Sequence, residues 1–173
     1  MTIPFFMEEE YNSMIADLWQ TEEVQKMATC FQHVSAVTCL DHCLMVSYFS
    51  YCFCRFFGWK AKEAARAGLL HDCYLYDWRR RDSHQGHHAF LHPQIACANA
   101  ERISPLTELE KDIILKHMWP LTLTFPKYKE SYVVTLADKI CATIELLHLY
   151  PLLAIGRKKK GITISSSWKK TLS

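Results

Sequence analysis

The chain of 173 residues is long enough for one domain with a substantial core, and its 50% hydrophobic content argues against extensive disorder. A formal net charge of only +2 excludes a polycation built to coat nucleic acid, so nucleic acid is not an expected partner. Five glycines and six prolines are too few for a β-sandwich with many tight turns. We therefore predict one all-α domain over residues 1–156, followed by a basic tail over residues 157–173.

Hydrophobic periodicity and capping signals divide this domain into helical segments. We expect them over residues 8–30, 34–57, 60–71, 92–104, 107–117 and 131–149. Gly58 ends the second segment, and Thr107 with Glu110 forms a capping box at the start of the fifth. Pro93 suits the first helical position of the fourth, because the N–H that proline lacks is unpaired there. Between residues 73 and 90 the periodicity is lost, which predicts a polar loop.

Eight cysteines raise the question of a disulfide scaffold, but their placement argues against one. Six of them lie inside apolar helical patterns, as small core residues do: Cys39, Cys43, Cys52, Cys54, Cys97 and Cys141. No C-x-x-C pair is present, so a zinc ribbon is not supported. The apolar stretch over residues 44–57 is too short to cross a bilayer, and the chain begins with an acidic run, unlike a signal peptide. We expect reduced thiols, no membrane partner and a cytoplasmic protein.

Four of the predicted helical segments each place an ionisable side chain on an apolar face, where residues three and four positions apart are neighbours. The neighbours of His42 and Asp138 at these spacings are mostly apolar, those of His117 are two isoleucines, and His71 follows small residues. An unpaired buried carboxylate is costly even after the protein relaxes. A shared cation would neutralise the carboxylates and accept the imidazole lone pairs, so the pattern predicts metal ligands.

Asp72 directly follows His71. Adjacent helical residues diverge by about 100°, so at a helix end a long histidine and a short aspartate can reach one ion from two directions. A carboxylate has two oxygens and can bridge two ions. Imidazole and carboxylate ligands without thiolate favour Fe, Mn, Co, Ni or Mg over a structural zinc.

The order of these residues resembles that of the HD superfamily of metal-dependent phosphohydrolases. The resemblance covers about residues 33–145 and rests on the strings Leu40-Asp41-His42-Cys43, Ala67-Gly68-Leu69-Leu70-His71-Asp72 and Leu136-Ala137-Asp138-Lys139. It implies a compact all-helical HD-type domain. It also implies a first divalent ion held by His42, His71, Asp72 and Asp138.

His92 before a proline and His117 resemble the second-metal histidines of binuclear members. Where the cyclic-dinucleotide branch of the family has two adjacent histidines, this chain has His117 followed by Met118, so one ligand is missing. The resemblance implies a second ion on Asp72, His92 and His117, and whether one ion or two bind stays open. The chain also lacks the Gly-Tyr-Pro string of that branch, which argues against a cyclic dinucleotide as substrate.

The reaction implied by the resemblance is hydrolysis of a nucleotide or another small phosphoester. Two ions about 3.5–4 Å apart would polarise the phosphoryl oxygens and activate a bridging water, with Asp72 as the shared catalytic ligand. Lys139 is a second catalytic candidate, because it is adjacent to a predicted ligand and could bind the phosphate. Arg79 and Arg80 could also bind that phosphate, or lie in a solvated loop. His88 is either a spare ligand or a substrate contact.

Two other functions stay open on the sequence alone. Similar ligand sets serve di-iron oxygenases of the same superfamily, which need redox-active iron and consume O₂. A non-catalytic metal-binding or nucleotide-sensing module would keep the pocket without turnover. Hydrolysis is preferred because it is the majority chemistry of the family, which is an associational argument. Neither the substrate nor the oligomeric state follows from the sequence.

Overall fold

The computed structural model describes residues 6–32, 37–78, 87–147 and 149. Within these ranges the protein consists of α-helices and one short 3-10 helix, without strands. The elements in chain order are α1 (Phe6–Trp19), α2 (Glu22–Lys26), η1 (Met27–Thr29), α3 (Cys39–Phe56), α4 (Ala61–Leu70), α5 (His88–Ile103), α6 (Glu108–Lys116) and α7 (Lys129–Leu146). The predicted all-α fold class is confirmed. The predicted tail over residues 157–173 lies outside the described residues.

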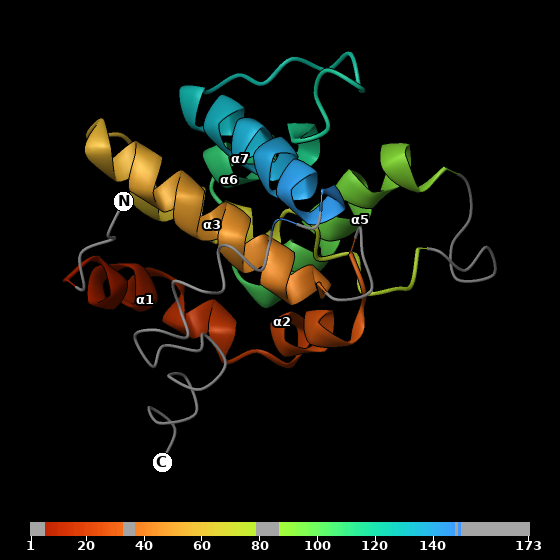
Figure 1. The fold of residues 1–173 in the computed structure, drawn as a ribbon, viewed down its shortest axis with the longest axis horizontal. Coiled ribbons are helices and arrows are strands. Elements are labelled where there is room, and N and C mark those ends of the chain that lie inside the picture. Colours follow the sequence, from red (N-terminus) through yellow and green to blue (C-terminus); the bar gives the residue numbers. More distant parts are fainter. Residues whose placement is uncertain (1–5, 33–36, 79–86, 148, 150–173) are drawn as a thin grey trace.

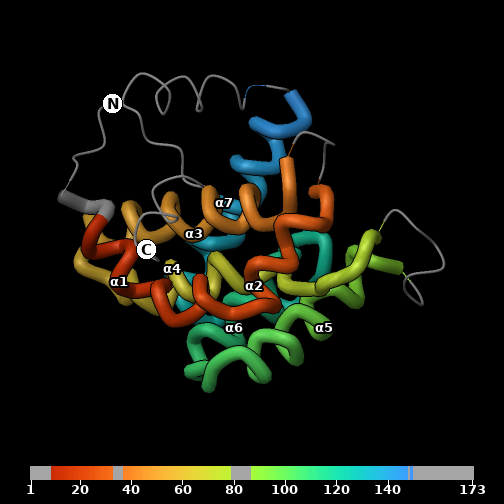
Figure 2. Tube along the Cα trace, turned by 90° about the horizontal axis from the view of Figure 1, so that it is seen from below, coloured from red at the N-terminus to blue at the C-terminus, as the bar shows by residue number. Residues whose placement is uncertain are grey.

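Helix α4 lies at the centre of the fold and contacts α1, α3, α5, α6 and α7. In Figure 1 α3 and α7 run side by side, and Figure 2 shows α4 between α3 and α6. Its neighbours can approach closely because its side chains are small: Ala64, Ala65 and Ala67 are fully buried. The polar residues of α4, Lys62, Glu63 and Arg66, lie on the one face that is not buried, and the remaining residues pack against the neighbouring helices.

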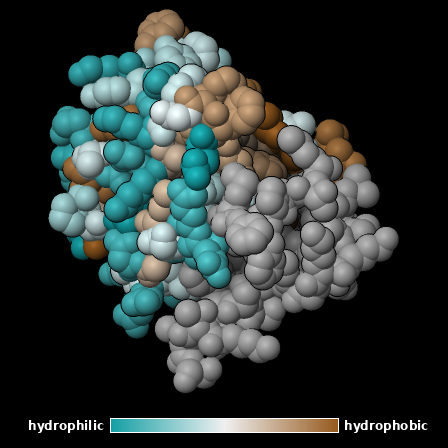
Figure 3. Space-filling view, turned by 90° about the vertical axis from the view of Figure 1, so that its left-hand side faces the viewer, coloured by the Kyte–Doolittle hydropathy of each residue, from teal (hydrophilic) through white to brown (hydrophobic). Residues whose placement is uncertain are grey.

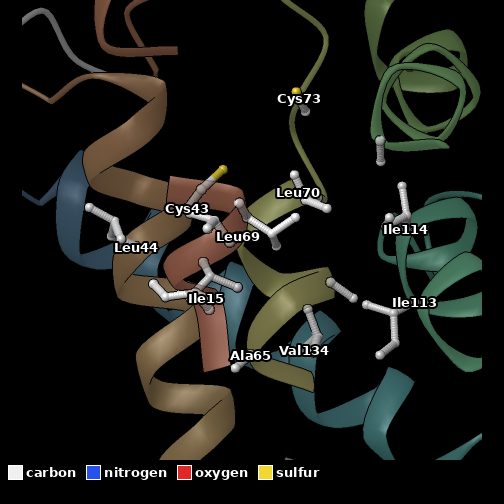
Figure 4. Close-up of a cluster of buried hydrophobic side chains, with 14 of the residues drawn as sticks. Ile15, Cys43, Leu44, Ala65, Leu69, Leu70, Cys73, Ile113, Ile114 and Val134 are labelled. Carbon is white, nitrogen blue, oxygen red and sulfur yellow. The ribbon is translucent and has the colours of Figure 1, made fainter. Parts of the chain in front are cut away.

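Side chains from all seven described α-helices form a continuous hydrophobic core, and Figure 4 shows part of it. The labelled helical members are Ile15 of α1, Cys43 and Leu44 of α3, Ala65, Leu69 and Leu70 of α4, Ile113 and Ile114 of α6 and Val134 of α7. Burying one large aliphatic side chain stabilises the fold by about 1.5–3 kcal/mol. All eight cysteines are free, and all but Cys52 are buried, so they serve as core residues rather than cross-links.

Capping residues set the starts of two helices. Thr38 forms a capping box with Asp41, so α3 begins at Cys39, later than the predicted start at residue 34. The predicted capping box of Thr107 and Glu110 is present at the start of α6. Local side chains therefore fix both boundaries.

The prediction for the start of α5 is wrong. The helix begins at His88, and Pro93 lies inside it rather than at its first position. The backbone N–H of Leu91 bonds to the carbonyl of His87 at 3.2 Å, so the first turn forms ahead of the proline. Pro93 then removes a single hydrogen bond close to the helix start. The earlier start places His88 one turn before His92 on the same helix.

Some large apolar side chains remain on the surface. Phe53, Phe56 and Phe57 lie at the C-terminal end of α3, and Phe56 is 82% exposed. Figure 3 views the molecule from the side where this end of α3 lies in Figure 1, and shows apolar side chains gathered beside hydrophilic ones. Among the described helices, none combines the length and the apolarity needed to cross a membrane.

The contact between α3 and α4 depends on Gly68. A Cβ at this position would lie 2.9 Å from the Cα of Ser47 on α3. Because that atom is backbone, the helices would have to separate, and we expect Gly68→Ala to lower the free energy of unfolding by about 1–3 kcal/mol. Lys62→Ala on the exposed side of α4 should change it little. Chemical denaturation measures both variants, and wild-type stability of Gly68→Ala would contradict the close packing.

Candidate metal centre

Six ionisable side chains meet where the ends of α4 and α6 approach α3, α5 and α7. They are His42 on α3, His71 at the C-cap of α4, Asp72 directly after it, His92 on α5, His117 at the C-cap of α6 and Asp138 on α7. All six are at most 8% exposed. The structure thus brings together every residue that the sequence predicts as a metal ligand.

The first group of ligand atoms comes from His42, His71 and Asp72, and these atoms lie within 4.8 Å of one another. Asp138 borders the same group: its Oδ1 is 3.1 Å from Nε2 of His42 and 3.7 Å from Nε2 of His71. Nε2 of His71 is buried without a hydrogen-bond partner, which ordinarily costs about 1–3 kcal/mol. A cation among these atoms would satisfy that nitrogen and neutralise the carboxylates.

Asp72 also belongs to a second group, with His92 and His117. Oδ1 of Asp72 lies 3.2 Å from Nε2 of His92 and 3.5 Å from Nε2 of His117. The two histidine Nε2 atoms are themselves 2.8 Å apart. One carboxylate therefore borders both groups, so that Asp72 could bridge two cations. The buried groups could hold a metal ion, and their nitrogen and oxygen ligands suit Fe, Mn, Co, Ni or Mg.

Main-chain carbonyls orient three of the four histidines. Nδ1 of His71 contacts the carbonyl of Gly68 at 2.8 Å, and Nδ1 of His117 contacts that of Ile114 at 2.8 Å. Both histidines follow the last residue of a helix, where carbonyls lack an N–H partner. His92 makes the same kind of contact one turn back, at 2.9 Å. Because a carbonyl only accepts, Nδ1 carries a proton, and Nε2 is the nitrogen left to bind a cation.

His42 has a carboxylate at each ring nitrogen. Its Nδ1 lies 2.7 Å from Oε1 of Glu145 on α7, and its Nε2 faces Asp138. Burial opposes protonation, but the hydrogen bonds with Asp138 and Glu145 raise the pKa of His42 well above its usual value. A cation that binds between His42 and Asp138 must therefore displace the Nε2 proton.

The sequence pattern did not indicate Glu145. This residue is 0% exposed, and its Oε2 has no hydrogen-bond partner. The sequence does contain a signal for this residue: Glu145 follows Asp138 by seven residues, or two helical turns, and so lies on the same face of α7. A glutamate on the buried face of a helix needs a partner, and the partner here is His42.

A short chain of hydrogen bonds holds the other oxygen of Asp72. Nε2 of Gln32 donates to Asp72 Oδ2 at 2.6 Å, and the hydroxyl of Tyr74 donates to Oε1 of Gln32 at 2.7 Å. Asp72 Oδ1 has no hydrogen-bond partner and is left to face His92 and His117. The sequence did not indicate Gln32 or Tyr74, because both lie outside helices, where no periodicity relates them to the ligands.

Burial and charge act against each other on the cluster's pKa values. Burial alone would raise the pKa of Asp72, but the neighbouring imidazoles of His71, His92 and His117 hold it well below its usual value. Burial likewise opposes ionisation of Asp138, but its hydrogen bond with His42 and the nearby imidazole of His71 hold its pKa well below the usual value. Burial lowers the pKa of His117. The carboxylates are thus ionised and His117 neutral, the forms in which these groups bind metal. Burial opposes protonation of His92, but Asp72 raises its pKa, so a cation bound there must displace a proton, as at His42.

Lys139 lies at the solvent edge of the cluster. Its Nζ donates to the carbonyl of His117 at 2.9 Å and to Oδ2 of Asp138 at 3.3 Å. The side chain is 40% exposed, whereas that of Asp138 is 11% exposed. The structure therefore places the predicted phosphate-binding lysine beside two of the predicted ligands.

His88 stacks on His92 with ring centroids 4.6 Å apart, and its Nδ1 lies 2.9 Å from the hydroxyl of Tyr76. Neither ligand group includes His88. It therefore supports the His92 ring, and its predicted role as a substrate contact stays a prediction. Arg79 and Arg80, predicted to bind phosphate, lie outside the described residues.

Because Asp72 borders both groups, loss of its negative charge should empty both positions. We expect Asp72→Asn to reduce metal affinity by at least about 10-fold, so that little Mn²⁺ stays bound after desalting. Elemental analysis of the folded protein measures the bound metal. Asp41→Asn, which changes only a helix cap on α3, should retain wild-type metal. Equal retention by both variants would show that Asp72 is not a ligand.

His117 belongs to the second group alone. His117→Ala should lower the Mn²⁺ content at saturation by about one ion per chain, because the first group keeps its own ligands. The matched control is His87→Ala, since His87 is exposed and belongs to neither group. An unchanged Mn²⁺ content would leave a site for one ion and reassign His92 and His117 to other contacts.

Comparisons with known proteins return no match: no protein-family model fits the chain, and no curated protein or solved structure resembles it significantly. The chemical properties of the cluster therefore follow from its own atoms. These atoms are two carboxylates, four imidazoles, and the side chains and carbonyls that orient them.

Proposed function

We propose that the chain is an HD-type metal-dependent phosphohydrolase that cleaves a nucleotide or another small phosphoester. One observation carries this proposal: the carboxylate of Asp72 borders two buried groups of ligand atoms. Paired cation sites suit displacement at phosphorus, because both the attacking and the leaving oxygen need stabilisation. The motifs that resemble the HD superfamily support the same chemistry.

The chain's own residues have two tasks in this proposal. Asp72 would contribute to both cation positions. The histidines, held through Nδ1 by main-chain carbonyls, would bind the cations through Nε2. A divalent cation bound there would polarise a phosphoryl oxygen and lower the pKa of a water molecule. The low exposure of the ligands keeps bulk water away, so their charges are screened less than charges at the surface.

Lys139 is the proposed phosphate-binding residue. An ammonium group has three donors, and the contacts with His117 and Asp138 use two of them. The remaining donor can reach a phosphate oxygen from the solvent side. The two protein contacts also keep Nζ close to the ligands, so a phosphoester bound to Lys139 would lie beside the cation positions.

The proposed activity is tested by loading the full chain with Mn²⁺ and measuring phosphate release from nucleotides and generic phosphoesters without O₂. We expect hydrolysis under these conditions. The ligand set also suits a di-iron oxygenase, which would show no hydrolysis and would consume O₂ when loaded with iron. A metal-loaded chain that releases no phosphate from any of these substrates contradicts the proposal.

Replacing the Lys139 ammonium tests its role within that activity. A hydrogen bond to a charged group contributes about 1.5–3 kcal/mol, so Lys139→Met should lower kcat/KM by about 10–100-fold while the metal content stays unchanged. Lys129→Met provides the control, because Lys129 is an exposed lysine on the same helix, away from the cluster. Equal kinetics for Lys139→Met and wild type would remove Lys139 from the substrate site.

A further inference from the structure

The four cluster histidines are not oriented in the same way. His71, His92 and His117 direct Nδ1 to main-chain carbonyls. Nδ1 of His42 instead meets the carboxylate of Glu145 at 2.7 Å. A carboxylate carries a full negative charge where a carbonyl carries a partial one, so its hydrogen bond to an imidazole is stronger.

The position of His42 in its helix explains this difference. His42 lies in the first turns of α3, and its own N–H bonds to the carbonyl of Thr38 at 3.1 Å as in a regular helix. The unpaired carbonyls available at the ends of α4 and α6 are therefore absent here. The partner of Nδ1 comes from α7, where Glu145 and Asp138 share a face and contact the two ring nitrogens.

The burial of the Glu145 carboxylate indicates that its contact with His42 serves a role other than stabilising the fold. The side chain is 0% exposed and Oε2 has no hydrogen-bond partner. Such a carboxylate destabilises the fold compared with an apolar side chain of similar volume. Its contact with His42 offsets that cost, and connects Glu145 to the ligand atoms through one imidazole ring.

We propose that Glu145 is a positioning residue for the metal centre: it accepts a hydrogen bond from the Nδ1–H of His42, directs Nε2 toward Asp138 and makes the first group the tighter cation position. This inference rests on the proposed function, because it requires that the cluster bind metal. Partners that hydrogen-bond to a metal-binding histidine fix its orientation and increase its basicity. The second group has only main-chain carbonyls in this role, so it binds a cation more weakly.

The test is a titration of the metal-stripped full chain with Mn²⁺, comparing wild type with Glu145→Gln. The substitution keeps the shape of the side chain but removes its charge. We expect the tighter class of Mn²⁺ sites to weaken by about 10–100-fold, with any weaker class unchanged. The matched control is Glu130→Gln: Glu130 lies on the same helix, is 3% exposed and accepts the Lys60 N–H at 3.2 Å, away from the cluster.

A second measurement identifies which ring nitrogen of His42 carries the proton. In wild type loaded with Zn²⁺, the nitrogen NMR spectrum of labelled histidine should show His42 protonated at Nδ1, and Glu145→Gln should alter that signal without changing those of the other cluster histidines. A purely packing role for Glu145 would not produce this selective change. If Glu145→Gln does not fold, Glu145→Asp draws the carboxylate back from Nδ1 and should give the same selective loss.

The possible outcomes separate this inference from the proposed function. Wild type that binds no Mn²⁺ overturns both. Wild type that binds Mn²⁺ while Glu145→Gln binds it equally well overturns the inference alone. Equal weakening by Glu145→Gln and Glu130→Gln also overturns it, because that result would show a general effect of buried carboxylates on α7.

Discussion

The burial of charge inside the helical core is the constraint on which this structure depends. Two carboxylates and four imidazoles lie at most 8% exposed, and removing one partner from such a buried pair costs about 3–5 kcal/mol. The groups compensate one another only while their helices keep their present positions. His42 and Asp138 join α3 to α7, and Asp72 joins the end of α4 to α5 and α6. The polar cluster therefore ties together the helices that also share the apolar core.

The geometry of the centre follows from where helices end. α4 and α6 both stop at a histidine, and the free carbonyls of their last turns orient these two rings. α4 places His71 and Asp72 in the interior because its alanines and Gly68 let the neighbouring helices pack closely against it. The same close packing excludes water from the ligands. The packing of the helices and the position of the buried polar cluster thus depend on the same small residues.

Much of the centre could be predicted from the sequence, because helical spacing reveals a polar residue on an apolar face. That reasoning identified His42, His117 and Asp138. It did not extend to Gln32, which reaches Asp72 from outside any helix, since only tertiary packing brings that residue to the site. The predicted start of α5 is wrong because proline favours a helix start, whereas here the turn before Pro93 closes on the carbonyl of His87. Helical spacing therefore predicts which residues of a helix face the cluster, but not the residues that tertiary packing brings to it from outside the helices.

The central claim is that the buried histidines and aspartates exist to hold metal. The most direct measurement is an anomalous difference map from crystals of the full chain grown with Mn²⁺. The account predicts a peak among His42, His71, Asp72 and Asp138, and a second, weaker peak bordered by Asp72, His92 and His117. A map at saturating Mn²⁺ with ordered side chains but no peak at either position would contradict it.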